Sequence, residues 1–157
     1  MRTRLSLFPV LILAFLLLAG CSGKMAVINP DRIFEDSEAM KSGMAYLTNL
    51  SQELQDDISA SMEGSPGRRG PSAALQQKVS EAQQRYSEEQ QRVMGQVNDL
   101  FLKALETCRL KGRFSMVILK DAALAYDPAT DITRKVVEEM NKTPLTFSPP
   151  PSATVSP

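Results

Sequence analysis

Apolar residues recur at helical spacing in two long stretches of the chain, 31–62 and 72–113. Most of them lie three, four or seven positions apart, the spacing that places side chains on one face of an α-helix. In the first stretch they are Ile33, Met40, Met44, Leu47, Leu54 and Ile58, and in the second Leu75, Val79, Ala82, Tyr86, Val93, Val97, Leu100, Ala104 and Cys108. The glycines and prolines of the intervening segment, 63–71, interrupt helices. The pattern predicts an antiparallel helical hairpin with a narrow coiled-coil-like seam and arms of roughly 45–60 Å.

Short β-rich runs flank this hairpin on both sides. The predicted elements are strands at 25–29, 114–119 and 122–126 and a final helix over 132–142. Asn29 followed by Pro30 is typical of a helix N-terminus, so the first long helix is expected to begin there. Asp131 is expected to cap the final helix.

These elements predict an α+β fold that is mainly α. A long helical-hairpin arm, 30–113, is inserted into a small three-stranded β body made of 25–29 and 114–142, with a short C-terminal helix. Three short strands and one helix are too few to close a core, so we expect other copies of the chain to complete the sheet. The proline-rich segment 143–157 is predicted to be a disordered tail, for which a binding function stays open.

The first 20 residues are typical of a lipoprotein signal peptide. Two arginines precede an apolar run, 5–18, that is shorter than the ~20 residues of a transmembrane helix. The run ends in Leu-Ala-Gly-Cys, which resembles the bacterial lipobox, so we expect cleavage before Cys21 and acylation of its thiol; a plain secretory signal or an uncleaved anchor is the alternative. Ser22 favours outer-membrane sorting in Gram-negative bacteria. The lipidated linker 21–24 reaches roughly 10 Å, which would hold the body at the membrane with the arms in the periplasm.

Charge and composition exclude several classes of function. The sequence has 18 Lys and Arg against 18 Asp and Glu, and loss of two arginines with the leader leaves a net charge of −2. The chain therefore has no net positive charge that would attract nucleic acid, so we do not expect nucleic acid as a partner. The sequence has no His, no Ser or Cys nucleophile beside a base, no metal-ligand cluster and no phosphate-binding glycine loop, so we expect no enzyme, cofactor or small-molecule substrate. With Cys21 acylated, Cys108 lacks a disulfide partner and is expected to be a small buried apolar residue.

Three segments carry a resemblance to a known family. Residues 24–34 (KMAVINPDRIF), 116–127 (MVILKDAALAYD) and 131–133 (DIT) are similar to the opening strand, the strand pair of the body and the start of the last helix in the Skp (OmpH) family of periplasmic chaperones. The resemblance implies a homotrimer in which a small intersubunit β-barrel carries three helical arms around a cavity. It further implies that the cavity holds unfolded outer-membrane proteins without ATP. This chain departs from the family in its slightly acidic charge, shorter arms and predicted lipid anchor.

Several arm residues are candidates for contact with such a client. Met40, Met44, Met62 and Met94 would offer flexible apolar side chains that adapt to different partners. Alternatively they fill the hairpin seam, which we expect for Met40 and Met44. Met62 and Met94 are therefore the predicted client contacts.

Basic residues form a second set of candidates. They are Lys78, Arg85 and Arg92, which repeat every seven residues, and Arg68 and Arg69 in the loop. Glu81 and Glu88 lie four positions before Arg85 and Arg92, a favourable spacing for intrahelical ion pairs. We favour a solvated, salt-bridged face, with a client-contacting stripe as the alternative. The loop arginines would contact phospholipid or an acidic client, or simply keep the loop soluble.

Gly43 and Gly95 interrupt the two helices at nearly the same height of the folded hairpin, each at a cost of about 1 kcal/mol relative to Ala. We hypothesise that they form a joint that lets the arm bend and the cavity open. Close helix approach without bending is the competing explanation. For the whole chain, the rival to a chaperone is a structural envelope lipoprotein, a coiled-coil spacer or docking module with the same hairpin and anchor but no affinity for unfolded chains.

Overall fold

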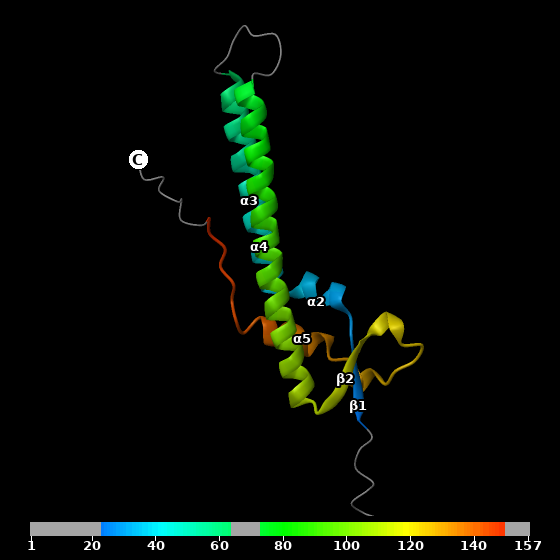
Figure 1. The fold of residues 1–157 in the computed structure, drawn as a ribbon. Coiled ribbons are helices and arrows are strands. Elements are labelled where there is room, and N and C mark those ends of the chain that lie inside the picture. Colours follow the sequence, from blue (N-terminus) through cyan, green and yellow to red (C-terminus); the bar gives the residue numbers. More distant parts are fainter. Residues whose placement is uncertain (1–22, 64–72, 150–157) are drawn as a thin grey trace, which may run out of the picture.

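A long two-helix arm rises from a small body in the computed structural model, which describes residues 23–63 and 73–149. The elements are β1 (Lys24–Ile28), α2 (Pro30–Asp36), α3 (Glu38–Glu63), α4 (Ala73–Lys111), β2 (Phe114–Leu119), the 3-10 turns η1 (Lys120–Ala122) and η2 (Pro128–Thr130), and α5 (Thr133–Met140). Helices α3 and α4 lie side by side as the arm, and the other elements gather at one end (Figure 1). The predicted class, mainly helical with a small sheet and a C-terminal helix, is confirmed.

The first helical stretch is two helices rather than the single one predicted over 31–62. Asn29 caps α2 as expected, because its Oδ1 accepts a hydrogen bond from the Arg32 N–H at 3.0 Å. Ser37 then adopts an extended backbone conformation and ends α2. Its Oγ accepts a hydrogen bond from the Met40 N–H at 3.2 Å, so this fully buried serine also caps α3.

The sheet has two strands in the described part of the chain, so the predicted third strand is wrong. β1 and β2 pair in parallel, with Ala26 opposite Val117 and Ile28 opposite Leu119. Residue 122 instead ends the turn η1, and residues 123–126 follow it as an irregular segment in which Leu124 is fully exposed. The other edge of β1 is covered where the Ile132 N–H donates to the Val27 carbonyl at 3.0 Å. The prediction failed because alternation alone does not decide whether a segment pairs, and the outer edge of β2 stays unpaired within the described residues.

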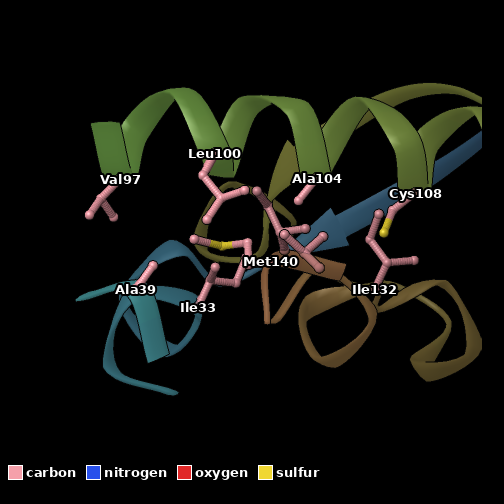
Figure 2. Packing of buried hydrophobic residues seen from close by; sticks show 11 residues of the cluster. Ile33, Ala39, Val97, Leu100, Ala104, Cys108, Ile132 and Met140 are labelled. Carbon is pink, nitrogen blue, oxygen red and sulfur yellow. The ribbon is translucent and has the colours of Figure 1, made fainter. Parts of the chain in front are cut away.

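The core lies where the base of the arm meets the body (Figure 2). Helix α4 contributes one face to it, and α2, the start of α3, β1 and α5 close the other side. The cluster consists of Ala26, Ile28, Ile33, Ala39, Val97, Leu100, Ala104, Cys108, Ile132, Val136 and Met140. Cys108 is 8% exposed, which confirms it as a small buried apolar residue.

Above the core, the arm buries only a narrow seam. Leu47, Leu50 and Leu54 from α3 are buried, as are Val93 and Val97 from α4. Most other side chains of the arm are exposed. The arm is therefore stabilised along one line of contacts, as the helical periodicity predicted.

Residues 143–149 are ordered against the arm, which corrects the prediction that the whole C-terminal segment is disordered. The segment leaves α5 and runs beside the arm (Figure 1). Leu145 and Phe147 are half-buried and pack against the core cluster. The prediction failed here because two apolar side chains suffice to attach a proline-rich segment to a surface that already exists. Residues 150–157 lie outside the described residues.

Candidate functional site

The candidate client-binding methionines expose their side chains along the arm. Met62 is 60% exposed near the outer end of α3, and Met94 is 40% exposed in the middle of α4. Met44, expected to fill the seam, is instead 52% exposed, while Met40 is half-buried against the core. Met44, Met62 and Met94 thus give the arm three accessible thioether side chains.

The basic stripe of α4 binds partners across the hairpin as well as within its helix. Lys78 Nζ donates to Ser61 Oγ at 2.7 Å, and Arg85 lies 3.6 Å from Glu53 of α3. Arg92 forms an ion pair with Glu89 at 2.6 Å. The ion pairs predicted between Glu81 and Arg85 and between Glu88 and Arg92 are wrong, because the two arginines pair with Glu53 and Glu89 instead. Glu81 and Glu88 accept hydrogen bonds from Gln77 and Gln84. The stripe therefore joins α3 to α4, and its partners leave little free positive charge.

A polar cluster that the sequence analysis missed lies in the middle of the arm. Glu89, only 5% exposed, accepts a hydrogen bond from the Tyr46 hydroxyl at 2.7 Å and hydrogen bonds from two nitrogens of the Arg92 guanidinium. The same guanidinium lies over the Tyr46 ring, 5.7 Å from its centroid. These contacts link α3 to α4 where the hydrophobic seam is interrupted.

The cluster shifts the titration of its members in opposite directions. Hydrogen bonds from Arg92 lower the pKa of Glu89, and the Tyr46 hydroxyl adds to this effect against the opposing effect of burial. The pKa of Arg92 is raised, chiefly by Glu89. Burial raises the pKa of Tyr46. Glu89 and Arg92 therefore stay charged and Tyr46 stays protonated at neutral pH.

The C-terminal segment lies against this same cluster. The Phe147 ring stacks on Tyr46 with centroids 6.2 Å apart. Ser42 Oγ donates to the Leu145 carbonyl at 3.2 Å, and Arg92 donates to the Ser148 carbonyl at 3.0 Å. The arm thus adds one aromatic side chain and two hydrogen-bond donors to the packing of Leu145 and Phe147 on the core cluster.

The two glycines have different surroundings. A Cβ at Gly43 would lie 2.6 Å from Val93 Cγ1 and 3.4 Å from the Phe147 ring, whereas a Cβ at Gly95 would meet nothing within 4 Å. Gly43 therefore allows close approach of α4 and of the C-terminal segment. The joint formed by both glycines stays a prediction, since the two helices run through these positions without interruption.

The body carries exposed apolar side chains around its small sheet. They are Met25 in β1, Met116 and Leu119 in β2, and Leu124 in the segment that follows; each is at least about half exposed. The outer edge of β2 pairs with no strand within residues 23–63 and 73–149. An apolar surface beside an open sheet edge is typical of an interface.

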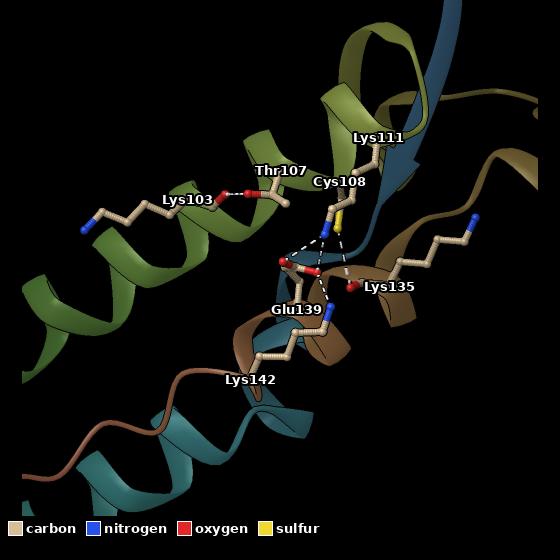
Figure 3. A network of polar contacts seen from close by, with 7 residues as sticks. All are labelled: Lys103, Thr107, Cys108, Lys111, Lys135, Glu139 and Lys142. Carbon is tan, nitrogen blue, oxygen red and sulfur yellow. Dashed lines mark hydrogen bonds and ion pairs between the residues drawn. The ribbon is translucent and has the colours of Figure 1, made fainter.

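Ion pairs tie the base of the arm to α5 (Figure 3). Glu139 accepts hydrogen bonds from Lys111 at 3.0 Å and from Lys142 at 2.6 Å, and these lower its pKa, Lys142 most. Cys108 Sγ donates to the Lys135 carbonyl at 3.4 Å nearby. These contacts hold α5, and with it the start of the C-terminal segment, against α4.

Some predicted sites lie outside the described residues, namely Cys21, Arg68 and Arg69. Within residues 23–63 and 73–149, no helix is long and apolar enough to cross a membrane. Over the same residues, no cluster of three or more His, Cys, Asp or Glu could hold a metal ion.

Comparison with known proteins identifies the fold. No protein-family profile and no curated protein matches the sequence. Among solved structures, the chain is similar to an OmpH-like protein from Caulobacter crescentus that is assigned as an outer membrane chaperone. The TM-score is 0.55 at 17% identity, over 79% of this chain and 87% of that chain. At this identity the similarity concerns the fold, and it confirms the OmpH-like fold inferred from the sequence.

Proposed function

We propose that this OmpH-like fold acts as an ATP-independent holdase chaperone of the bacterial envelope, which binds unfolded outer-membrane proteins between its arms. The observation that supports it most is the arm itself. It extends well beyond the core and keeps Met44, Met62 and Met94 accessible. Flexible apolar side chains on a long surface suit a partner that has no fixed shape.

The proposal includes a homotrimer and a lipid anchor. The exposed apolar side chains of the body and the open edge of β2 are features that further copies of the chain would cover. Acylation of Cys21 would place the body at the membrane, because β1 begins only three residues later, at Lys24. A periplasmic position, with the outer membrane as the expected site, follows from that anchor.

A structural envelope lipoprotein is the second candidate. It is favoured by the basic stripe, whose side chains pair across the hairpin or within α4 and would stiffen a spacer. Such a protein would form the same oligomer and carry the same anchor, but would not bind unfolded chains.

The two candidates separate in one experiment on residues 21–157 with Cys21→Ser. Light scattering gives the mass of the protein alone and mixed with an outer-membrane β-barrel protein diluted from urea. A trimer that keeps the β-barrel protein soluble in a complex of defined mass is expected. A trimer beside an aggregating client would favour the structural lipoprotein, and a monomer would refute the trimer.

A variant pair tests whether the arm surface carries the binding. Met44→Gln, Met62→Gln and Met94→Gln together keep helix propensity and length but remove apolar surface, so we expect client capacity to fall while the trimer persists. The matched control replaces the exposed Gln55, Gln76 and Gln90 by Ala and should keep full capacity. Equal capacity of both triple variants would show that the client binds elsewhere.

A further inference from the structure

The C-terminal segment alternates along its length. Leu145 and Phe147 are half-buried on the arm, whereas Thr146 and Ser148 are exposed. A period of two is the pattern of an extended chain with one apolar face, as in a β-strand. The segment therefore offers the arm one side of an extended chain.

The hydrogen bonds from the arm go to the main chain of this segment. The two hydrogen bonds from the arm, from Ser42 and Arg92, go to the backbone carbonyls of Leu145 and Ser148. Backbone carbonyls are common to every extended chain, so these contacts do not require a particular sequence. Selectivity rests on the apolar side chains alone, above all on Phe147 against Tyr46.

Gly43 makes room for the aromatic ring. A Cβ at this position would lie 3.4 and 3.7 Å from two Phe147 ring carbons. The lack of a side chain at Gly43 and the Tyr46 ring together form a shallow seat for one aromatic residue. Tyr46 forms one wall, and its ring is inclined by only 30° to that of Phe147.

The residues of the seat also have partners within the arm. Two nitrogens of the Arg92 guanidinium donate hydrogen bonds to the buried Glu89. Glu89 also accepts a hydrogen bond from the Tyr46 hydroxyl. Tyr46 and Arg92, which contact Phe147 and Ser148, are therefore also held by Glu89 of the arm. A preorganised surface of this kind loses less conformational entropy when a ligand binds to it.

We propose that Ser42, Gly43, Tyr46 and Arg92 form a binding seat for extended polypeptide with apolar residues at alternate positions, and that residues 144–148 occupy it as an internal ligand. An incoming unfolded chain displaces this segment. Strand-forming stretches of unfolded β-barrel proteins have the required alternation, so the ligand class rests on the proposed function. Because the segment follows α5 directly, it competes at a high effective concentration.

The test uses residues 21–157 with Cys21→Ser and a release variant that adds Leu145→Ser and Phe147→Ser. The probe is a fluorescein-labelled peptide with the sequence of residues 143–149, and its anisotropy reports binding. If the segment fills at least nine-tenths of the seats, the release variant binds the peptide at least about tenfold more tightly than the parent protein. Thr146→Ala, which changes an exposed side chain of the same segment, should bind like the parent.

Two further measurements make the result specific. Adding Tyr46→Ala to the release variant should abolish the gain, and a peptide with both apolar residues changed to Ser should not bind. Equal affinity of the release variant and the parent, or no binding to the release variant, would overturn the inference.

Client capacity in the β-barrel assay separates this inference from the proposed function. If the client stays soluble but the peptide does not bind the release variant, the binding seat is refuted and the proposed holdase function is not. If the release variant binds the peptide but the client aggregates, the proposed holdase function is refuted. The binding seat is then supported, with an extended ligand other than an unfolded β-barrel protein.

Discussion

Replacing Glu89 by Ala should destabilise the arm more than any change at its exposed glutamates. The substitution removes a carboxylate that is 5% exposed and leaves the Tyr46 hydroxyl and the Arg92 guanidinium without their shared acceptor. Glu88, the preceding residue, is exposed and only accepts from Gln84 on the same helix. The two positions thus form a matched pair.

The magnitude follows from the contacts. A hydrogen bond to a charged group contributes about 1.5–3 kcal/mol, which applies to the 2.7 Å contact from Tyr46. The Arg92 side chain is 33% exposed, so solvent reduces its ion pair to about 0.5–1 kcal/mol. We expect Glu89→Ala to lower the free energy of unfolding by ~2–4 kcal/mol and Glu88→Ala to lower it by under ~0.5 kcal/mol. Glu89→Gln keeps an acceptor for Tyr46 and should fall between them.

The difference should also depend on pH. The pKa of Glu89 is lowered in the folded chain, first by Arg92, so its contribution is fully present above the pKa of an unfolded Glu, ~4.3. That contribution is lost as the pH falls through the lower folded value. The gap between the wild type and Glu89→Ala should therefore be full at pH 7 and shrink below about pH 4.

Urea unfolding followed by circular dichroism at 222 nm measures these differences, at one fixed protein concentration because oligomerisation shifts apparent stability. Each variant is measured at pH 7 and pH 3. Equal unfolding of Glu89→Ala and Glu88→Ala at pH 7 would contradict a stabilising contribution of the buried carboxylate. An unchanged stability difference between the wild type and Glu89→Ala at pH 3 would contradict the lowered pKa of Glu89.

Further predictions concern the glycines, the helix break and the buried thiol. Gly95→Ala should raise the thermal midpoint of unfolding, because there is open space around the added Cβ. Gly43→Ala should have a lower midpoint than Gly95→Ala, because its Cβ would clash with Val93. The opposite order of the two midpoints would contradict this geometry. Ser37→Ala should cost about 1–2 kcal/mol in urea unfolding through loss of a helix cap, and a neutral result would remove its function at the break. Burial raises the pKa of Cys108, so its labelling by a thiol reagent in the variant Cys21→Ser should be slow in the folded chain and fast in urea; equal rates would place the thiol at the surface.

The arm was predictable because helical periodicity is a local signal. The seam residues of α3 and α4 repeat at three and four positions whatever the rest of the chain does. The break at Ser37 also has a sequence signal, since a serine followed by an acidic residue, Glu38, is typical of a helix N-terminus. We did not predict it because the apolar period continues across this position. A third strand was predicted from alternation over 122–126, and alternation cannot say whether a partner strand exists.

The polar cluster and the ordered C-terminal segment were harder to predict. Glu89 lies in a charged stretch of α4, where a glutamate is ordinarily exposed. A signal was present: Glu89 falls four positions before Val93 and seven after Ala82, so it occupies the seam. For the segment, the alternation of Leu145 and Phe147 was the signal. It could not be interpreted from the sequence, because the surface that these two side chains contact forms only when α3 and α4 pack together.

The parallel pairing of β1 with β2 sets the order in which the chain can fold. Ser115 Oγ donates to the Lys24 carbonyl from 91 positions away, and the whole arm lies between the two strands. During synthesis, which proceeds from the N-terminus, β1 has no strand partner until α4 and β2 have been made. Zipping of α3 against α4 uses nearer contacts and brings the strands together, so it reduces the loop-closure entropy of the pairing. Substitutions that weaken the arm should therefore slow the formation of a sheet that they never touch.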